Sequence, residues 1–157
     1  MSVEHDADGL GPPDLKVAGL QVWAHNQPFG LSDEPYDADW LTVTVHCGGS
    51  GPSVWVRGEI LTASAFDRLA RGCDELYKRL DGQARLDADE SALTVLLAAS
   101  DRHGHVSMVV DITPDHLTQL HRFEFDLDQS YLPDVAAQCR NLLVRFPNPH
   151  AHDERAV

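Results

Sequence analysis

Three residues of types that bind metals lie close together near the middle of the chain. Asp101, His103 and His105 are spaced two apart, and side chains two apart in an extended segment share a face. Such a set of carboxylate and imidazole groups is typical of metal ligands. Gly104, however, places the triplet in or beside a hairpin turn, where polar residues have a structural use. We therefore favour a turn, and we expect a protein that folds without a metal or another cofactor.

A second cluster of reactive groups lies between residues 26 and 39, a segment with two prolines, one glycine and four acids: Asp33, Glu34, Asp37 and Asp39. Grouped carboxylates can bind a hard cation or act as acid and base. The segment lacks the ligand spacing of a calcium loop, and shifted pKa values need burial that a loop rarely provides. We predict a long acidic surface loop without catalytic activity.

The three cysteines are odd in number and widely spaced, which is typical of free thiols in a reducing compartment. Cys73 and Cys139 fall on the apolar stripes of predicted helices, and Cys47 lies on the apolar face of a predicted strand. Thiols in such places behave as small hydrophobic groups rather than as nucleophiles. We expect no disulfide. Because no glycine-rich phosphate loop opens a helix either, the sequence offers no catalytic residue, and we do not expect an enzyme.

The spacing of apolar residues predicts two amphipathic helices. The first follows Thr62, its expected N-cap, and ends near Gly82, which we expect in the left-handed conformation. Its apolar face consists of Phe66, Leu69, Cys73, Leu76, Tyr77 and Leu80. The second helix follows Ser130, its expected N-cap, and has Pro133 in its first turn. Its apolar face consists of Val135, Ala136, Cys139, Leu142, Leu143 and Phe146.

Strands are predicted mostly where apolar and polar residues alternate, so that one face is buried. In 53–60, however, Val54, Trp55 and Val56 are apolar on both faces, which is typical of a central strand or of a twisted strand whose rings close an end of the core. The predicted strands are 15–25, 40–47, 53–60, 93–99, 106–112 and 120–127. Residues 83–89 are polar and form either a short edge strand or an extended loop. In the last strand the alternation is clean. Its inward face is predicted to carry His121, Phe123, Phe125 and Leu127.

The order of these elements, with short connections between consecutive strands, favours antiparallel pairing. We predict an α+β fold, in which an antiparallel, mostly meandering sheet of about six or seven strands carries both helices on one face. Four side chains should be buried between the helices and the sheet: Leu69, Leu76, Leu142 and Phe146.

One domain is predicted to span residues 15–147. Residues 1–14 are acidic and rich in Gly and Pro, which is typical of a mobile tail. Residues 148–157 form a polar C-terminal tail, in which His150 and His152 repeat the metal-type spacing without making a site. No apolar run approaches the roughly 20 residues that span a bilayer. Since residues 1–13 also lack the features of a secretory signal, we expect a cytoplasmic protein without a membrane partner.

The balance of charges limits the classes of partner. The chain has 12 basic and 25 acidic residues, for a net charge of −13. Direct binding of nucleic acid needs clustered Lys and Arg to contact phosphates, so we expect no nucleic-acid partner. The acidity suits a basic protein partner, because attraction between opposite charges accelerates association. Alternatively, it serves only to keep the protein in solution.

Three segments together resemble a known family. They are Asp-Ala-Asp-Trp-Leu at 37–41, Ile-Leu-Thr at 60–62, and Asp-Gln-Ser-Tyr-Leu at 128–132 leading into a helix that ends Arg-Phe-Pro at 145–147. Over about residues 15–147 the chain resembles bacterial immunity proteins of the WapI immunity protein type and their relatives. The resemblance implies a cytoplasmic antitoxin-like protein that covers the active site of a secreted toxin, often a nuclease or tRNA-cleaving domain. It carries over no catalytic residue.

We therefore expect an immunity-type protein that binds and neutralises a cognate toxin. Its binding surface should combine acids with aromatic anchors, and the candidate residues are Asp33, Glu34, Tyr36, Asp37, Asp39 and Trp40. Trp23 and Trp55 lie on strands that could neighbour this loop, and the Tyr36 ring could alternatively fold back over the core. The alternative functions are a structural or regulatory homodimer, or a small-molecule-binding domain that uses an open sheet face.

Overall fold

The computed structural model describes residues 9–49, 51–87, 92–115 and 117–150, and the structural statements that follow refer to these residues. The strands are β1 (Leu15–Val17), β2 (Leu20–Asn26), β3 (Trp40–Gly48), β4 (Ser53–Thr62), β5 (Gln83–Leu86), β6 (Leu93–Ala99), β7 (His105–Ile112) and β8 (His121–Asp128). The helices are α2 (Pro35–Ala38), α3 (Ala63–Arg79) and α4 (Leu132–Arg145), with a 3-10 turn, η1 (Gln129–Tyr131), before α4.

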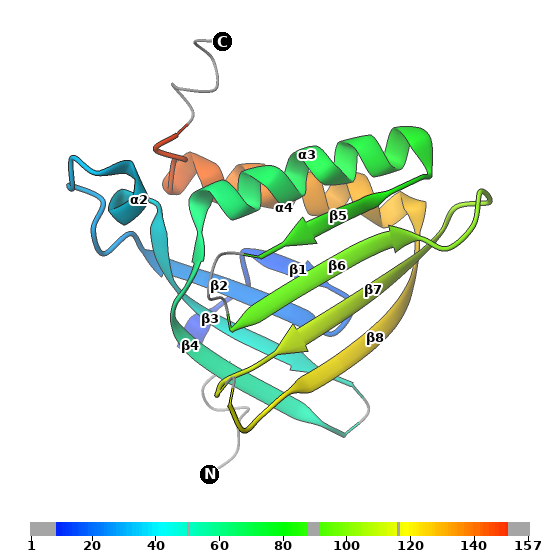
Figure 1. The fold of residues 1–157 in the computed structure, drawn as a ribbon, viewed down its shortest axis with the longest axis horizontal. Coiled ribbons are helices and arrows are strands. Elements are labelled where there is room, and N and C mark those ends of the chain that lie inside the picture. Colours follow the sequence, from blue (N-terminus) through cyan, green and yellow to red (C-terminus); the bar gives the residue numbers. More distant parts are fainter. Residues whose placement is uncertain (1–8, 50, 88–91, 116, 151–157) are drawn as a thin grey trace.

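The strands form two antiparallel sheets of four strands, in the orders β1-β2-β3-β4 and β5-β6-β7-β8. The prediction of one sheet with six or seven strands is therefore wrong, although antiparallel pairing and the meander within each sheet are confirmed. Helix α3 lies between β4 and β5 in the chain. Because the chain crosses over the molecule in α3, β5 begins a new sheet instead of extending the first (Figure 1).

The apolar faces of both sheets contribute to one buried core. Helix α3 packs against β5 and against α4, while α4 packs against β1. The two helices thus cover the margin where β1 and β5 lie, as Figure 1 shows, rather than one face of a single sheet as predicted. This arrangement follows because each sheet has an apolar face to bury, and the two faces bury one another.

Helix α3 begins as predicted, because the Thr62 side chain accepts a hydrogen bond from the Ala65 backbone N–H at 3.2 Å. The predicted end is wrong in detail. Leu80, not Gly82, is the left-handed C-cap residue, with φ of 51°, although Gly82 also has a positive φ. Most of the predicted apolar face is buried, but Tyr77 is 48% exposed and Leu80 is half-buried.

Helix α4 has a different start from the predicted one. Asp128 is the N-cap of the preceding η1 turn, and its carboxylate accepts the Ser130 N–H at 2.8 Å, so Ser130 donates instead of capping. Pro133 lies in the first turn of α4, as predicted. The apolar face is confirmed, and three of the four predicted core residues, Leu69, Leu76 and Leu142, are buried. Phe146 is half-buried against the same core.

The predicted strand 15–25 is two strands, β1 and β2, joined by a two-residue turn at Ala18 and Gly19. Ala18 adopts φ of 50°. A Cβ atom on Gly19 would lie 2.0 Å from the Gly48 carbonyl oxygen and 2.9 Å from Phe125 Cζ. Gly19 therefore lies in a close contact between the β1–β2 turn, the end of β3 and strand β8 of the other sheet.

The remaining strands match the predictions within two residues at each end, and residues 83–86 form a strand rather than a loop. In β8 the inward and outward faces alternate as predicted. None of the described helices is both long and apolar enough to cross a membrane. Residues 1–8 of the predicted N-terminal tail, and His152 with the rest of 151–157, lie outside the described residues.

Candidate partner-binding surface

The segment between β2 and β3 contains most of the candidate binding residues, and it is folded by local turns. The Gly30 N–H donates to the Gln27 carbonyl at 3.1 Å, and the Ser32 N–H donates to the Phe29 carbonyl at 2.9 Å. Helix α2 then begins at Pro35, which suits a first helical position because its missing N–H would have no partner there. The predicted acidic loop thus has a defined path and a short helix.

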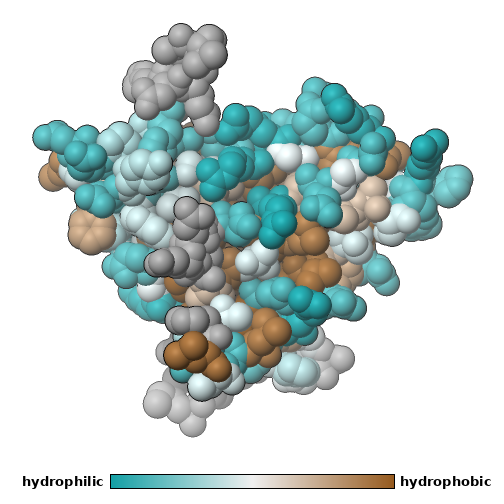
Figure 2. All heavy atoms as spheres, in the orientation of Figure 1, coloured by the Kyte–Doolittle hydropathy of each residue, from teal (hydrophilic) through white to brown (hydrophobic). Residues whose placement is uncertain are grey.

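This loop exposes apolar and acidic side chains together. Tyr36 is 78% exposed and Phe29 is 52% exposed, and Leu31 is also exposed. Between residues 26 and 39 the sequence has four acids and no Lys, Arg or His. We call the exposed set the loop surface; it consists of Phe29, Leu31, Asp33, Glu34, Tyr36 and Asp37. Figure 2 shows brown atoms among teal ones at the left margin, where Figure 1 places the α2 loop.

Asp39 is placed differently from the other candidate acids, because only 4% of it is exposed. Its carboxylate accepts the Ser64 backbone N–H at 2.8 Å and the Ser64 hydroxyl at 2.5 Å. Its backbone carbonyl accepts the Ala63 N–H at 2.9 Å. Asp39 therefore satisfies donors in the first turn of α3, beside the cap that Thr62 provides.

Trp40 is half-buried at the start of β3, where it pairs with Thr62. The structure therefore brings four of the six candidate residues, Asp33, Glu34, Tyr36 and Asp37, together on the exposed loop. Asp39 is buried and Trp40 is half-buried instead. The alternative reading for Tyr36, a ring folded over the core, does not match its exposure.

Phe29 and Leu31 belong to the loop surface and were missed by sequence reasoning. Their signal was present: two large apolar residues flank Gly30 after Pro28, in a segment without alternation or helical spacing. A second group was also missed, after α4. His150 contacts Tyr36 ring to ring, with centroids 5.5 Å apart, and its segment was predicted only as a polar tail.

Trp23 and Trp55 lie against each other instead of at the loop surface. Their ring centroids are 5.8 Å apart with nearly parallel planes, and the His46 ring lies 4.3 Å from Trp55. The indole N–H of Trp23 donates to the Gly11 carbonyl at 2.9 Å. Burial lowers the pKa of His46, which favours the neutral ring in this stack. These rings form a packed cluster on the outward side of β2, β3 and β4.

The metal-type triplet forms a turn, as favoured. One Asp101 carboxylate oxygen accepts the His103 and His105 backbone N–H groups at 2.8 and 3.3 Å, and the other contacts His105 Nδ1 at 2.5 Å. The hydrogen bond from His105 lowers the pKa of Asp101 to about 2, and the same bond raises the pKa of His105. Within the described ranges no group of three His, Cys, Asp or Glu residues is arranged to hold a metal ion.

The three cysteines are buried free thiols. Burial raises the pKa of Cys47 to about 11 and that of Cys73 to about 12, and it raises the pKa of Cys139 as well. A thiol with such a pKa is almost entirely protonated at neutral pH, and the protonated form is a poor nucleophile. These positions therefore serve packing.

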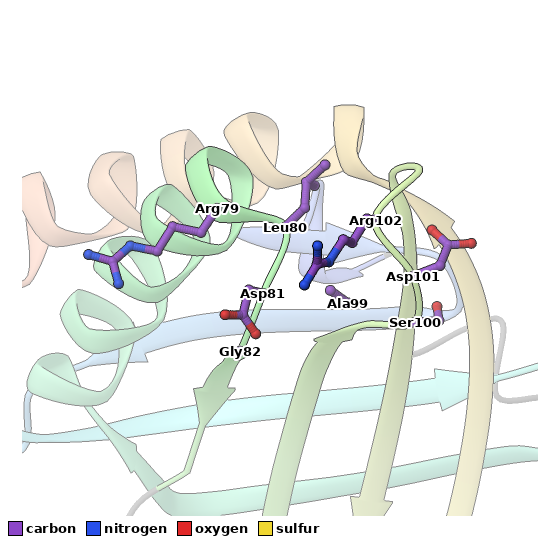
Figure 3. Close-up of a pocket in the computed structure, with 8 residues that line it drawn as sticks. All are labelled: Arg79, Leu80, Asp81, Gly82, Ala99, Ser100, Asp101 and Arg102. Carbon is purple, nitrogen blue, oxygen red and sulfur yellow. The ribbon is translucent and has the colours of Figure 1, made fainter.

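A polar cavity of about 450 Å³ lies between the end of α3 and the β6–β7 turn (Figure 3). Figure 3 shows Arg79 extending away from the other lining side chains, and its guanidinium pairs with Glu75 at 3.2 Å. The Asp101 carboxylate is occupied by its own turn, and it also points away from Arg102. Because these two side chains do not converge on the cavity, they provide no pair of polar contacts for a small molecule.

Comparison with protein families agrees with the resemblance of the three segments. The model of the Immunity protein WapI-like family matches residues 15–147. The chain belongs to the WapI-like immunity protein family. No curated protein and no solved structure matches it.

The matched range covers both sheets, α2, α3, α4 and the whole loop surface of this WapI-like protein. It ends at Pro147, so Asn148 and His150 lie beyond it. Immunity protein families are generally non-enzymatic.

Proposed function

We propose that this WapI-like protein binds a cognate toxin domain through its loop surface and neutralises it without catalysing a reaction. Family membership supports an immunity role in general. The observation that most supports this particular surface is the exposure of two aromatic rings and a leucine beside three carboxylates, without a cation in the same loop. The proposal places the protein in the cytoplasm, with a toxin domain as partner.

The chemistry of the loop surface specifies what the partner should present. Aromatic side chains supply much of the binding energy of protein interfaces when they enter a pocket and lose contact with water. Carboxylates at the rim attract a basic surface and accelerate encounter. We therefore expect a toxin surface with Lys or Arg around an apolar pocket, and Tyr36 as the side chain that enters the pocket.

The net charge of −13 supports the same kind of partner. A strongly acidic protein approaches a basic one faster than diffusion alone allows, and salt weakens this effect by screening. Apolar contacts are much less sensitive to salt. The complex should therefore form fastest at low salt and persist at physiological salt through the rings.

The test is co-expression with the C-terminal domain that the adjacent gene encodes, followed by pull-down across a salt series. We compare the wild type with a Tyr36→Ala, Asp37→Asn double variant. Its matched control is the double variant Tyr131→Ala, Asp126→Asn. This control removes an exposed ring near the start of α4 and an exposed charge on β8.

The loop variant should lose most of the complex, and the control should retain it. Absence of a complex at low salt would contradict toxin binding. A complex that is indifferent to salt and to the loop variant would preserve toxin binding and exclude this surface.

A further inference from the structure

Helix α2 presents Tyr36, yet it has only four residues, from Pro35 to Ala38. Isolated helices need roughly 12 to 15 residues before they are even marginally stable in water. The α2 backbone bonds, such as Ala38 N–H to the Glu34 carbonyl at 3.0 Å, therefore cannot hold the helix by themselves. Contacts with the rest of the molecule must do so.

One of these contacts joins α2 to the segment after α4. The Gln27 side-chain amide donates to the Ala38 carbonyl at 3.3 Å and to the Pro147 carbonyl at 3.2 Å. A single side chain thus connects the end of α2 with a residue more than 100 positions later. Figure 1 shows the segment after α4, in red, close to the α2 loop.

His150 makes the second contact. Its ring meets the Tyr36 ring edge to face, with centroids 5.5 Å apart and an angle of 71° between the planes. Its Nε2 atom lies 3.6 Å from a carboxylate oxygen of Asp39. The ring is therefore in contact with both α2 and the buried acid that follows α2.

The segment that carries His150 is itself anchored. The His150 backbone N–H donates to the Asn148 side chain at 2.9 Å, and the Asn148 amide donates to Asp67 on α3 at 3.1 Å. Asn148 is buried. A continuous series of contacts therefore leads from α3 through Asn148 and His150 to Tyr36.

We infer that residues 147–150 are a support for the loop surface, and that His150 is the positioning residue that holds Tyr36 in its binding orientation. The effect of His150 on toxin binding rests on the proposed function. The role of His150 in holding Tyr36 can be tested in the free protein alone. Fixing a side chain before binding reduces the entropy lost in the complex. By that reasoning, loss of the His150 ring should weaken toxin binding by about 2- to 10-fold.

The first experiment uses the free, full-length protein and measures hydrogen exchange of backbone amides. The variant is His150→Ala, and the matched control is His103→Ala, which removes an exposed imidazole from the β6–β7 turn. We expect faster exchange at Asp37, Ala38 and Asp39 in the His150 variant only. Exchange in β3 should stay unchanged. Unchanged exchange in α2 would overturn the inference.

The second experiment measures affinity for the toxin domain in a cycle of Tyr36→Ala, His150→Ala and the double variant. If His150 acts through Tyr36, its removal should weaken binding in the wild-type background and have no effect once Tyr36 is Ala. An equal loss in both backgrounds, or no loss in either, would overturn the positioning role. If the wild type binds no toxin domain, the proposed function fails, while hydrogen exchange still decides whether His150 holds α2.

Discussion

Asp39 connects the loop surface to the body of the protein at the scale of one residue. Its carboxylate accepts a hydrogen bond from the Ser64 backbone N–H in the first turn of α3, and the short helix α2 ends directly before Asp39. A buried carboxylate is stable in such a place because it accepts several hydrogen bonds and lies at the positive end of a helix. Asp39 therefore has a structural role, although the sequence places it among the acids of an exposed loop.

Replacing Asp39 by Ala should lower the free energy of unfolding by about 1 to 3 kcal/mol, because the buried Ser64 N–H would lose its partner. Urea denaturation measures this change. The matched control is Asp33→Ala on the exposed loop, which should stay within about 0.5 kcal/mol of the wild type. Equal stability of the two variants would mean that Asp39 does not support α3.

The Asp101–His105 pair gives a prediction that depends on pH. In Asp101→Asn, the pKa of His105 should fall back toward its ordinary value of 6.5, because the carboxylate that raises it is gone. Titration of the His105 ring followed by NMR measures the shift, and the His121 ring in the same spectra serves as the control. An unchanged His105 pKa would contradict the pairing.

The sign of the effect on stability follows from the direction of each shift. The pKa of His105 is raised on folding. The contribution of His105 to the free energy of unfolding is therefore fully present below pH 6.5 and disappears as the pH rises through the raised pKa. The pKa of Asp101 is lowered to about 2. Its contribution to the free energy of unfolding is therefore present above pH 3.8 and disappears as the pH falls through about 2.

Secondary-structure elements were largely predictable because each carries its own pattern. Alternation identified most of the strands, and spacings of three and four identified α3 and α4. The grouping into two sheets was not predictable in this way, because alternation says that a strand has one buried face and not which sheet it joins. The turn at Ala18 and Gly19 was missed although the alternation shifts there, from buried Leu15 and Val17 to buried Leu20 and Val22. Ala18 concealed the shift, because it is apolar and extends the even-numbered series backwards.

Charge and composition were enough to predict part of the candidate surface. Asp33, Glu34, Tyr36 and Asp37 are exposed together, as the acidic loop predicted. The burial of Asp39 and the contact from His150 were not predictable, because both depend on residues distant in the sequence. The partners are Ser64 for Asp39 and Tyr36 for His150.

Leu76 tests the apolar face of α3 at the scale of the element. Its side chain is buried between α3 and the core, so Leu76→Ala should lower the free energy of unfolding by about 2 to 5 kcal/mol. Leu117→Ala, the same change at a side chain that is 83% exposed, should have an effect below about 0.5 kcal/mol. Chemical denaturation compares the two, and a small effect at Leu76 would contradict the helix face.

Gly19 tests how the two sheets meet in the whole molecule. A methyl group there would overlap the Gly48 carbonyl oxygen and approach Phe125 of the other sheet. Gly19→Ala should therefore lower the free energy of unfolding by about 1 to 3 kcal/mol or more. Gly49→Ala, at a position where a Cβ atom meets nothing within 4 Å, is the matched control. Similar melting temperatures for the two variants would contradict the close packing of Gly19 against Gly48 and Phe125.

The loop between β2 and β3 also affects how such a protein can evolve. None of residues 29–37 is buried, so mutations and changes of length there leave the two-sheet core unaltered. Under the proposed function, selection by a new toxin would act on these positions without first destabilising the fold. If the loop surface binds the toxin as proposed, a lineage that keeps Asp39, Ser64 and the neighbouring strands would acquire a new specificity by replacing the exposed rings and charges, on the same scaffold.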